Sequence, residues 1–142
     1  MIYCDASLIV SAFADEDLSM LARSFLRRIE TRDLAVSAWV ATEVASALAM
    51  KLRRGEIDDG ERTILLSRWE NFRAPVSVTA IESDDFALAA TLVDAEPRGL
   101  RAGDALHLAI VRRASCALAT LDRDLADAAE AVGVEVALRP PA

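Results

Sequence analysis

Short apolar segments alternate with longer amphipathic segments along the chain. In 18–29, apolar side chains recur at Leu18, Leu21, Phe25 and Ile29, a spacing typical of a helix that buries one face. Other apolar runs are only a few residues long and rich in Val, Ile and Leu, which indicates buried strands. The pattern predicts five short strands, at 2–4, 34–37, 76–79, 116–120 and 134–138.

Helices are predicted between these strands. Gly55 and Gly133 stand where two of the helices should end, since glycine readily takes the conformation that follows a helix. Asp58 or Asp59 is expected near one N-cap, and Ser83 is expected to cap another, with Asp84 and Asp85 favourable in its first turn. The predicted helices are 6–12, 18–29, 38–53, 58–71, 83–95, 102–113 and 122–132.

Strands that alternate with helices imply crossover connections and a parallel sheet covered by helices on both faces. The 142 residues fit one α/β domain, 1–142, without repeats or linkers. Ligands bind such sheets outside the carboxyl ends of the strands. The candidate chemistry should therefore be sought among residues that directly follow a strand.

The amino-acid composition argues against several classes of protein. The hydrophobic fraction of 54% supplies one core, but no apolar run approaches the roughly 18 residues of a membrane span. The first residues match a core strand rather than a signal peptide, so we expect a cytoplasmic protein without a membrane partner. Cys4 and Cys116 are expected to be buried thiols rather than a disulfide, and two cysteines with one histidine make a poor zinc set.

The net charge of −7 argues against broad electrostatic binding of nucleic acid. It does not exclude a nuclease, because a metal ion brings a phosphate to an acidic pocket. Lys51 is the only lysine among 16 basic residues, and arginine forks suit phosphate contacts. The paired arginines elsewhere along the chain are expected to be solvated faces.

Two aspartates directly follow predicted strands. Asp5 follows the first strand and Asp122 follows the fourth, which places both at the carboxyl edge of the sheet. Each also stands where a helix begins, and capping that helix is a sufficient reason for an aspartate. Taken singly, either residue is explained as an N-cap.

Two further acids lie in apolar helices. Glu43 lies in the most apolar helix, with Trp39 and Val40 one turn before it. A lone helix glutamate is usually solvated, which is the plain alternative here, but a carboxylate placed among apolar side chains needs a cation or a proton as partner. Asp104 begins the apolar helix 102–113, where an exposed first-turn aspartate is the plain alternative. His107 is one turn further on and is interpreted as a structural residue more readily than a catalytic one.

Carboxylates are the only well-represented reactive groups. The chain has no glycine-rich phosphate loop, and its single histidine makes a Ser-His-Asp triad a weak hypothesis. Oxygen ligands suit Mg²⁺ or Mn²⁺. Two other acidic-pocket enzymes are alternatives, but Ser7 stands where a haloacid-dehalogenase phosphatase needs a second aspartate, and a receiver domain needs a late lysine that the chain lacks.

These residues resemble the PIN-domain family, and within it the VapC-type toxins of toxin–antitoxin modules. The resemblance covers nearly the whole chain. It rests on Asp5-Ala6-Ser7 after the first strand, on Glu43, on the segment from Arg101 through Asp104 to Ala109, and on Thr120-Leu121-Asp122-Arg123-Asp124-Leu125. Each piece is short, but their order and spacing together make the match specific.

The resemblance implies an α/β/α sandwich with a central parallel five-stranded sheet. It implies an acidic pocket of Asp5, Glu43, Asp104 and Asp122 that binds Mg²⁺ or Mn²⁺ and cleaves RNA. It also implies a homodimer and inhibition by a cognate antitoxin protein. Ser7 and Thr120 match the hydroxyl positions that support the pocket, and Asp124 is the alternative to Asp122 as the fourth acid. Arg101 and Arg123, which are near the acids in sequence, are candidates to hold RNA phosphates. A PIN fold that binds without turnover is a further alternative.

Overall fold

The structure is a computed structural model of residues 1–142 and describes all of them except residue 98. Within the described residues, five strands form one sheet in the order β3-β2-β1-β4-β5, and every pair of neighbours is parallel. The predicted α/β fold with five parallel strands is confirmed. The strands are β1 (Ile2–Cys4), β2 (Leu34–Val36), β3 (Ser77–Val78), β4 (Ala117–Ala119) and β5 (Val136–Leu138).

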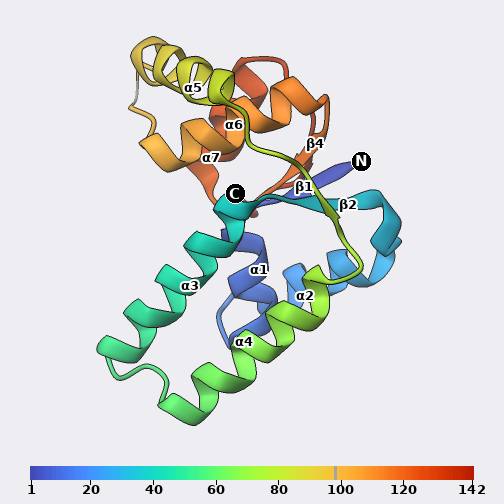
Figure 1. Ribbon diagram of the computed structural model, residues 1–142, viewed down its shortest axis with the longest axis vertical. Coiled ribbons are helices and arrows are strands. Elements are labelled where there is room, and N and C mark those ends of the chain that lie inside the picture. The colour runs from blue at the N-terminus through green and yellow to red at the C-terminus, as the bar shows by residue number, and fades with distance from the viewer. Residues whose placement is uncertain (98) are drawn as a thin grey trace.

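Helices cover both faces of the sheet (Figure 1). The first four helices lie below the sheet in this view and the last three lie above it. A short 3₁₀ turn, Thr31–Asp33, precedes β2. The helices are α1 (Ala6–Phe13), α2 (Ser19–Arg28), α3 (Ala38–Arg53), α4 (Asp59–Arg73), α5 (Ser83–Ala95), α6 (Ala102–Ala114) and α7 (Arg123–Ala131).

The strand order contains a reversal at the centre of the sheet. From β1 the chain proceeds outward through β2 to β3, and it then returns to place β4 on the other side of β1 before β5. The reversal separates the crossovers onto opposite faces, because each β-helix-β connection is right-handed. Crevices of open α/β sheets lie at this switch point, beyond the carboxyl ends of β1 and β4.

The central strands and α6 form the core. Tyr3 and Cys4 of β1 and Leu118 of β4 are fully buried. Every residue of α6 from Ala105 to Val111 is buried, as expected for a helix that packs on a sheet and also beneath α5. No helix among residues 1–97 and 99–142 has the length and hydropathy to cross a membrane.

Several predicted boundaries change by a few residues. Helix α3 has the predicted bounds, and Gly55 follows its C-cap at φ +71°. The expected N-cap Ser83 is wrong: Glu82 occupies that position in a capping box with Asp85. Ser83 is instead the first residue of α5, because Asp85 accepts a hydrogen bond from the Glu82 amide and is held in place by Arg113. Both cysteines are free thiols, with Cys4 buried and Cys116 partly buried.

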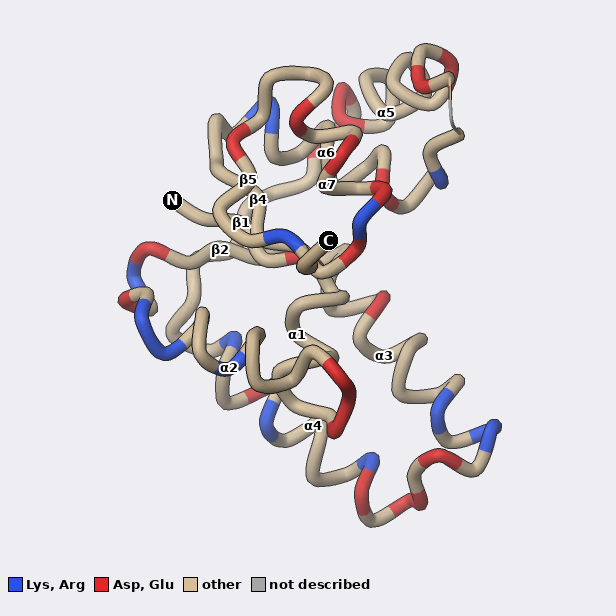
Figure 2. Tube along the Cα trace, turned by 180° about the vertical axis from the view of Figure 1, so that it is seen from behind, with Lys and Arg blue, Asp and Glu red and all other residues tan. Residues whose placement is uncertain are grey.

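Other strands and helices are shorter or longer than predicted for local reasons. The third strand is reduced to Ser77–Val78 at the edge of the sheet, where both residues are exposed. The fourth strand excludes Thr120, whose side chain turns to the polar cluster at the strand end. Asp122 caps α7 instead of beginning it. Positive and negative residues are interspersed along the helices of both layers (Figure 2). The expectation of solvated arginine pairs is wrong for Arg113, which pairs with the buried Asp85 of the neighbouring helix.

Candidate active site

An open cleft of about 590 Å³ lies at the switch point of the sheet. It receives residues from the end of β1, from α3 and α6, and from the segment that follows β4. Since α3 and α6 belong to opposite helical layers, the cleft is shared between the two halves of the fold (Figure 1). Six of the candidate site residues line it, Asp5, Ser7, Glu43, Arg101, Asp104 and Asp122, and His107 lines it as well.

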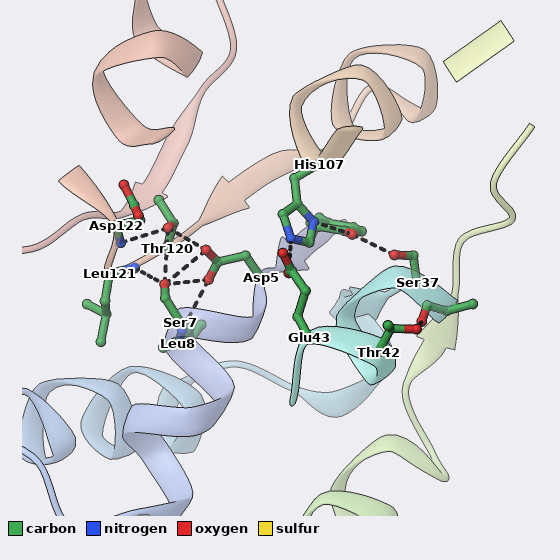
Figure 3. A network of polar contacts seen from close by, with 12 residues as sticks. Asp5, Ser7, Leu8, Ser37, Thr42, Glu43, His107, Thr120, Leu121 and Asp122 are labelled. Atoms are coloured by element: carbon green, nitrogen blue, oxygen red, sulfur yellow. Dashed lines mark hydrogen bonds and ion pairs between the residues drawn. The ribbon is translucent and has the colours of Figure 1, made fainter. Parts of the chain in front are cut away.

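Asp5 is the most buried of the four acids, with 3% of its surface exposed. Its Oδ1 accepts the Leu8 amide at 3.1 Å, so Asp5 caps α1. Its Oδ2 accepts the Thr120 hydroxyl at 2.7 Å, and Ser7 Oγ donates to the same carboxylate at 2.8 and 2.9 Å (Figure 3). Burial raises the pKa of Asp5, and the nearby His107 and these hydrogen bonds only partly oppose that increase.

Ser7 and Thr120 connect the ends of β1 and β4. Thr120 Oγ1 accepts the Asp122 amide at 2.9 Å while it donates to Asp5. Ser7 Oγ accepts the Leu121 amide at 2.8 Å. The two hydroxyls therefore hold the first acid against the segment that carries Asp122, which is the supporting position expected for them.

Asp122 caps α7 through Oδ1, which accepts the Leu125 amide at 3.0 Å. The N-cap interpretation of Asp5 and Asp122 is therefore correct, and it coexists with their place in the cleft. Asp124 is exposed in the first turn of α7 and is not among the residues lining the cleft. The geometry favours Asp122 over Asp124 as the fourth acid.

Asp104, in the first turn of α6, is electrostatically coupled to the other acids. Its pKa is raised to about 6, first by burial and then by the negative charges of Asp122 and Glu43. His107 and Arg101 lower it in part. The repulsion indicates that these carboxylates are close enough for the charge on one to oppose ionisation of another.

Glu43 projects from α3 toward α6 and meets His107. Glu43 Oε2 lies 2.5 Å from His107 Nε2, and His107 Nδ1 lies 2.9 Å from the Tyr3 hydroxyl (Figure 3). Tyr3 in turn contacts Ser37 Oγ at 2.7 Å. No pattern in the sequence pointed to Tyr3 or Ser37, and the helical spacing favoured Asp104 rather than Glu43 as the neighbour of His107.

Gly103 allows the close approach of Glu43 to α6. A Cβ atom at Gly103 would lie 3.1 Å from Glu43 Oε1 and 3.3 Å from Trp39 Cζ2. Contacts this short leave little space for a methyl group. Gly103 is therefore part of the wall against which the Glu43 side chain rests.

The two arginines expected to hold phosphates differ in position. Arg101 lines the cleft and is exposed. Arg123 Nη2 donates to the Pro141 carbonyl oxygen at 2.7 Å, at the C-terminal segment, and it is not among the lining residues. Arg101 is the better placed of the two to meet a substrate at the acids.

The cleft is suited by its chemistry to a hard divalent cation. Its acids offer oxygen ligands only, and Asp5 is buried with hydroxyl and amide donors in place of a basic side chain. No three acidic, histidine or cysteine side chains in the described part of the chain already stand in a metal-holding arrangement. The donor types fit an ion, and closure around one requires side-chain movement.

Comparisons with known proteins agree with this architecture. The family model for the PIN domain matches residues 2–131. Ribonuclease VapC3 of Pyrobaculum aerophilum is 33% identical over 129 residues, which cover 87% of this chain and 90% of that protein.

Two solved structures share the fold. The Mycobacterium tuberculosis toxin VapC20, described as cleaving the sarcin-ricin loop, superposes with a TM-score of 0.73 at 18% identity and covers 99% of this chain and 100% of its own. A chain of a toxin–antitoxin complex from Klebsiella pneumoniae gives a TM-score of 0.62 at 16% identity, over 86% of this chain and 87% of its own. With the family match spanning β1 to β4, the residues lining the cleft and all four acids, this chain belongs to the PIN-domain family.

Proposed function

We propose that the protein is a Mg²⁺- or Mn²⁺-dependent endoribonuclease that cleaves RNA phosphodiesters in the acidic cleft. The observation that carries the proposal is the convergence of Asp5, Glu43, Asp104 and Asp122 on one cleft from four separate parts of the chain. The raised pKa of Asp104 supports it, because burial and then the negative charges of Asp122 and Glu43 oppose ionisation of this carboxyl, and a bound cation would offset both. The names of the relatives supply the substrate class, RNA.

Asp5 and Asp122 are the proposed direct ligands of the ion. Asp5 is held by three donor groups and Asp122 by its place at the start of α7, so both are fixed before an ion arrives. Glu43 and Asp104 would bind through water or hold a second ion. A bound divalent ion supplies a Lewis acid for the scissile phosphate and lowers the pKa of a coordinated water.

The chain's own side chains have three tasks in this proposal. The Arg101 guanidinium meets a phosphate at the rim of the cleft. A carboxylate of the cleft accepts the proton of the attacking water. Ser7 and Thr120 keep Asp5 in one orientation throughout, because their hydroxyls bind both of its oxygens. The products expected from the family resemblance carry a 5′-phosphate and a 3′-hydroxyl.

The decisive experiment is cleavage of a defined RNA by wild-type protein and by Asp5→Asn, with and without Mg²⁺. Asparagine preserves the cap of α1 but removes the charge. The rate should fall by at least about 100-fold, because stabilisation by a metal ion is worth several kcal/mol and each 1.4 kcal/mol is tenfold. Asp94→Asn, the same change on an exposed position of α5, is the matched control and should cleave normally.

Two outcomes would contradict the proposal. If Asp5→Asn cleaves RNA as fast as the wild type, Asp5 has no place in the chemistry. If the wild type binds Mn²⁺ and RNA without cleaving RNA under any divalent ion, the protein is a binding module that keeps the PIN fold. A comparison of Asp122→Asn with Asp124→Asn identifies the fourth acid, and the larger loss is expected for Asp122.

We also propose that the protein is the toxin of a toxin–antitoxin pair and forms a homodimer. Support comes from the toxin VapC20 and from the toxin–antitoxin complex of Klebsiella pneumoniae, which share the fold. Co-expression with the product of a small adjacent open reading frame should relieve growth arrest. Growth arrest that also occurs with Asp5→Asn would contradict a toxin that acts through RNA cleavage.

A further inference from the structure

A buried chain of hydrogen bonds ends at Glu43. It begins at Ser37, directly after β2, and passes through Tyr3 of β1 and His107 of α6 to reach Glu43 on α3. Ser37, Tyr3 and His107 are 2%, 0% and 1% exposed, whereas the Glu43 side chain is 27% exposed and lines the cleft. In Figure 3, His107 lies directly above the carboxylate of Glu43, and Ser37 lies to the right of both.

The direction of these hydrogen bonds follows from the groups themselves. A carboxylate oxygen only accepts, so His107 Nε2 carries the hydrogen that faces Glu43. In the neutral imidazole, Nδ1 then accepts, and the Tyr3 hydroxyl is its donor. Tyr3 has one hydrogen to give, so Ser37 Oγ donates to the Tyr3 oxygen. With a neutral imidazole the order of donation is therefore Ser37 to Tyr3 to His107 to Glu43. In an imidazolium Nδ1 donates as well, and in either state Nε2 donates to Glu43.

We infer that His107 is the positioning residue that holds Glu43 ready for a divalent cation, with Tyr3 and Ser37 fixing the imidazole so that it presents its N–H to the carboxylate. This inference rests on the proposed function, because it assumes that the cleft binds such an ion. It assigns His107 no contact with RNA or with the reacting phosphate.

The burial of this chain of hydrogen bonds argues that it serves the site rather than the packing of the core. Polar side chains in a core must satisfy one another, and an apolar set of similar volume packs without that requirement. Here three buried polar side chains from three elements direct one N–H toward a residue at the cleft surface. A network that served packing alone has no reason to end on a half-exposed carboxylate.

Glu43 is restrained on its other side as well. Its Oε1 faces Gly103, where an added Cβ would lie 3.1 Å away, so the carboxylate rests between the imidazole and the start of α6. A free glutamate side chain loses rotamer freedom when it binds an ion. Because His107 already restrains Glu43 in the folded protein, the loss of side-chain entropy does not weaken binding of the ion.

The test is Mn²⁺ binding to the purified, metal-free protein by isothermal titration calorimetry. His107→Leu should weaken Mn²⁺ binding by about 10- to 100-fold, the range found for residues that orient metal ligands. His107→Gln should recover most of the affinity, since its amide nitrogen can donate where Nε2 stood. Tyr3→Phe keeps the ring but removes the donor to Nδ1, and an intermediate loss is expected.

A buried control separates positioning from stability. Val111→Ala lies one turn beyond His107 on α6 and is buried away from the cleft. It should lower the unfolding temperature but leave Mn²⁺ affinity unchanged. If His107→Leu fails to fold, as judged by circular dichroism, the comparison of His107→Gln with Tyr3→Phe still tests the inference. Equal affinity in both variants and the wild type would overturn it.

A double-mutant cycle tests whether His107 acts through Glu43. In a Glu43→Gln background, His107→Leu should change Mn²⁺ affinity by no more than about twofold, the scatter of independent effects. A loss as large as in the wild-type background would overturn the inference, as would equal behaviour of His107→Leu and His107→Gln.

The same variants distinguish the two proposals. Dependence of Mn²⁺ binding on His107, in a protein that cleaves no RNA, supports the positioning role and contradicts the ribonuclease. RNA cleavage and Mn²⁺ binding that are both unaffected by His107→Leu support the ribonuclease and overturn the positioning role.

Discussion

Two aspartates of this protein are buried, and their pKa values are shifted in opposite directions by their surroundings. Asp85, between α5 and α6, is 1% exposed and accepts Arg113 Nε at 2.7 Å and Arg113 Nη2 at 3.0 Å. Its pKa is lowered, chiefly by those hydrogen bonds. Asp5, at the sheet edge, is 3% exposed and accepts only hydroxyl and amide hydrogens among its recorded bonds. Its pKa is raised by burial.

The difference lies in the source of the positive charge. A buried carboxylate is stable when a cation accompanies it, and Asp85 has a guanidinium supplied by the fold. Asp5 is also held by several hydrogen bonds, but among residues 1–97 and 99–142 no basic side chain is recorded in hydrogen-bonding contact with it. The fold supplies a guanidinium as the partner of the structural Asp85, whereas the arrangement around Asp5 suits a cation bound from solution.

The largest change in stability is expected at the structural aspartate. Asp85→Ala removes two charge-assisted hydrogen bonds from Arg113 and the bond to the Glu82 amide, and should cost about 2 kcal/mol of unfolding free energy at pH 7. Urea unfolding at a series of pH values measures this.

The contribution of Asp85 to the free energy of unfolding should depend on pH in a definite direction. Because the folded-state pKa of Asp85 is lowered, its contribution is present above the unfolded pKa of about 3.9 and is lost as the pH falls through the folded value. Asp84→Ala, an exposed neighbour in the same turn, is the control and should cost much less. A deficit for Asp85→Ala that persists unchanged at pH 2 would contradict the ion-pair explanation.

Asp104→Asn should raise the free energy of unfolding, whereas Asp85→Ala lowers it, and the change should be smaller. The folded-state pKa of about 6 lies above the unfolded value, so the wild type is stabilised below about pH 4 and loses this stability as the pH rises through about 6. In metal-free protein at pH 8, asparagine should therefore raise the unfolding free energy by about 1 kcal/mol, allowing for solvent screening of this partly exposed group.

Thermal unfolding in the presence of a chelator measures this difference at pH 4 and pH 8. Only the pH 8 curve should shift upward for Asp104→Asn. Addition of Mn²⁺ should stabilise the wild type more than the variant. An equal shift at both pH values would show that charge repulsion is not its cause.

Gly103→Ala should have the smallest effect on stability of these substitutions. It should nevertheless reduce activity. Alanine gains about 1 kcal/mol of helix propensity over glycine, and the close contacts with Glu43 and Trp39 offset much of it. The unfolding temperature should change little while RNA cleavage falls several-fold. Gly60→Ala, in the first turn of α4 and remote from the cleft, is the matched control and should leave cleavage unchanged.

Much of the fold was predictable because periodicity records which faces are buried. The bounds of α3 followed from an apolar run that ends before glycine, and Asp5 and Asp122 followed from the rule that sites lie beyond the ends of parallel strands. Glu43 was conspicuous as a charge in an apolar helix. The roles of these acids in catalysis stay predictions.

The partners of His107 could not be predicted, because they depend on packing between elements distant in sequence. Tyr3 and His107 are 104 residues apart, and Ser37 has the ordinary appearance of a residue at the start of a helix. The N-cap of α5 was missed for a similar reason, since the bond from Arg113 to Asp85 crosses to another helix. Local patterns do not encode such contacts.

The place of β4 beside β1 has a consequence for the newly made chain. The first strand is synthesised before its neighbour at the cleft, and Asp5 and Thr120 are 115 residues apart in the chain. Until the segment after β4 has been made, Asp5 lacks its threonine partner. If the cleft cuts RNA, the activity can therefore begin only after the segment that carries Thr120 and Asp122 has left the ribosome.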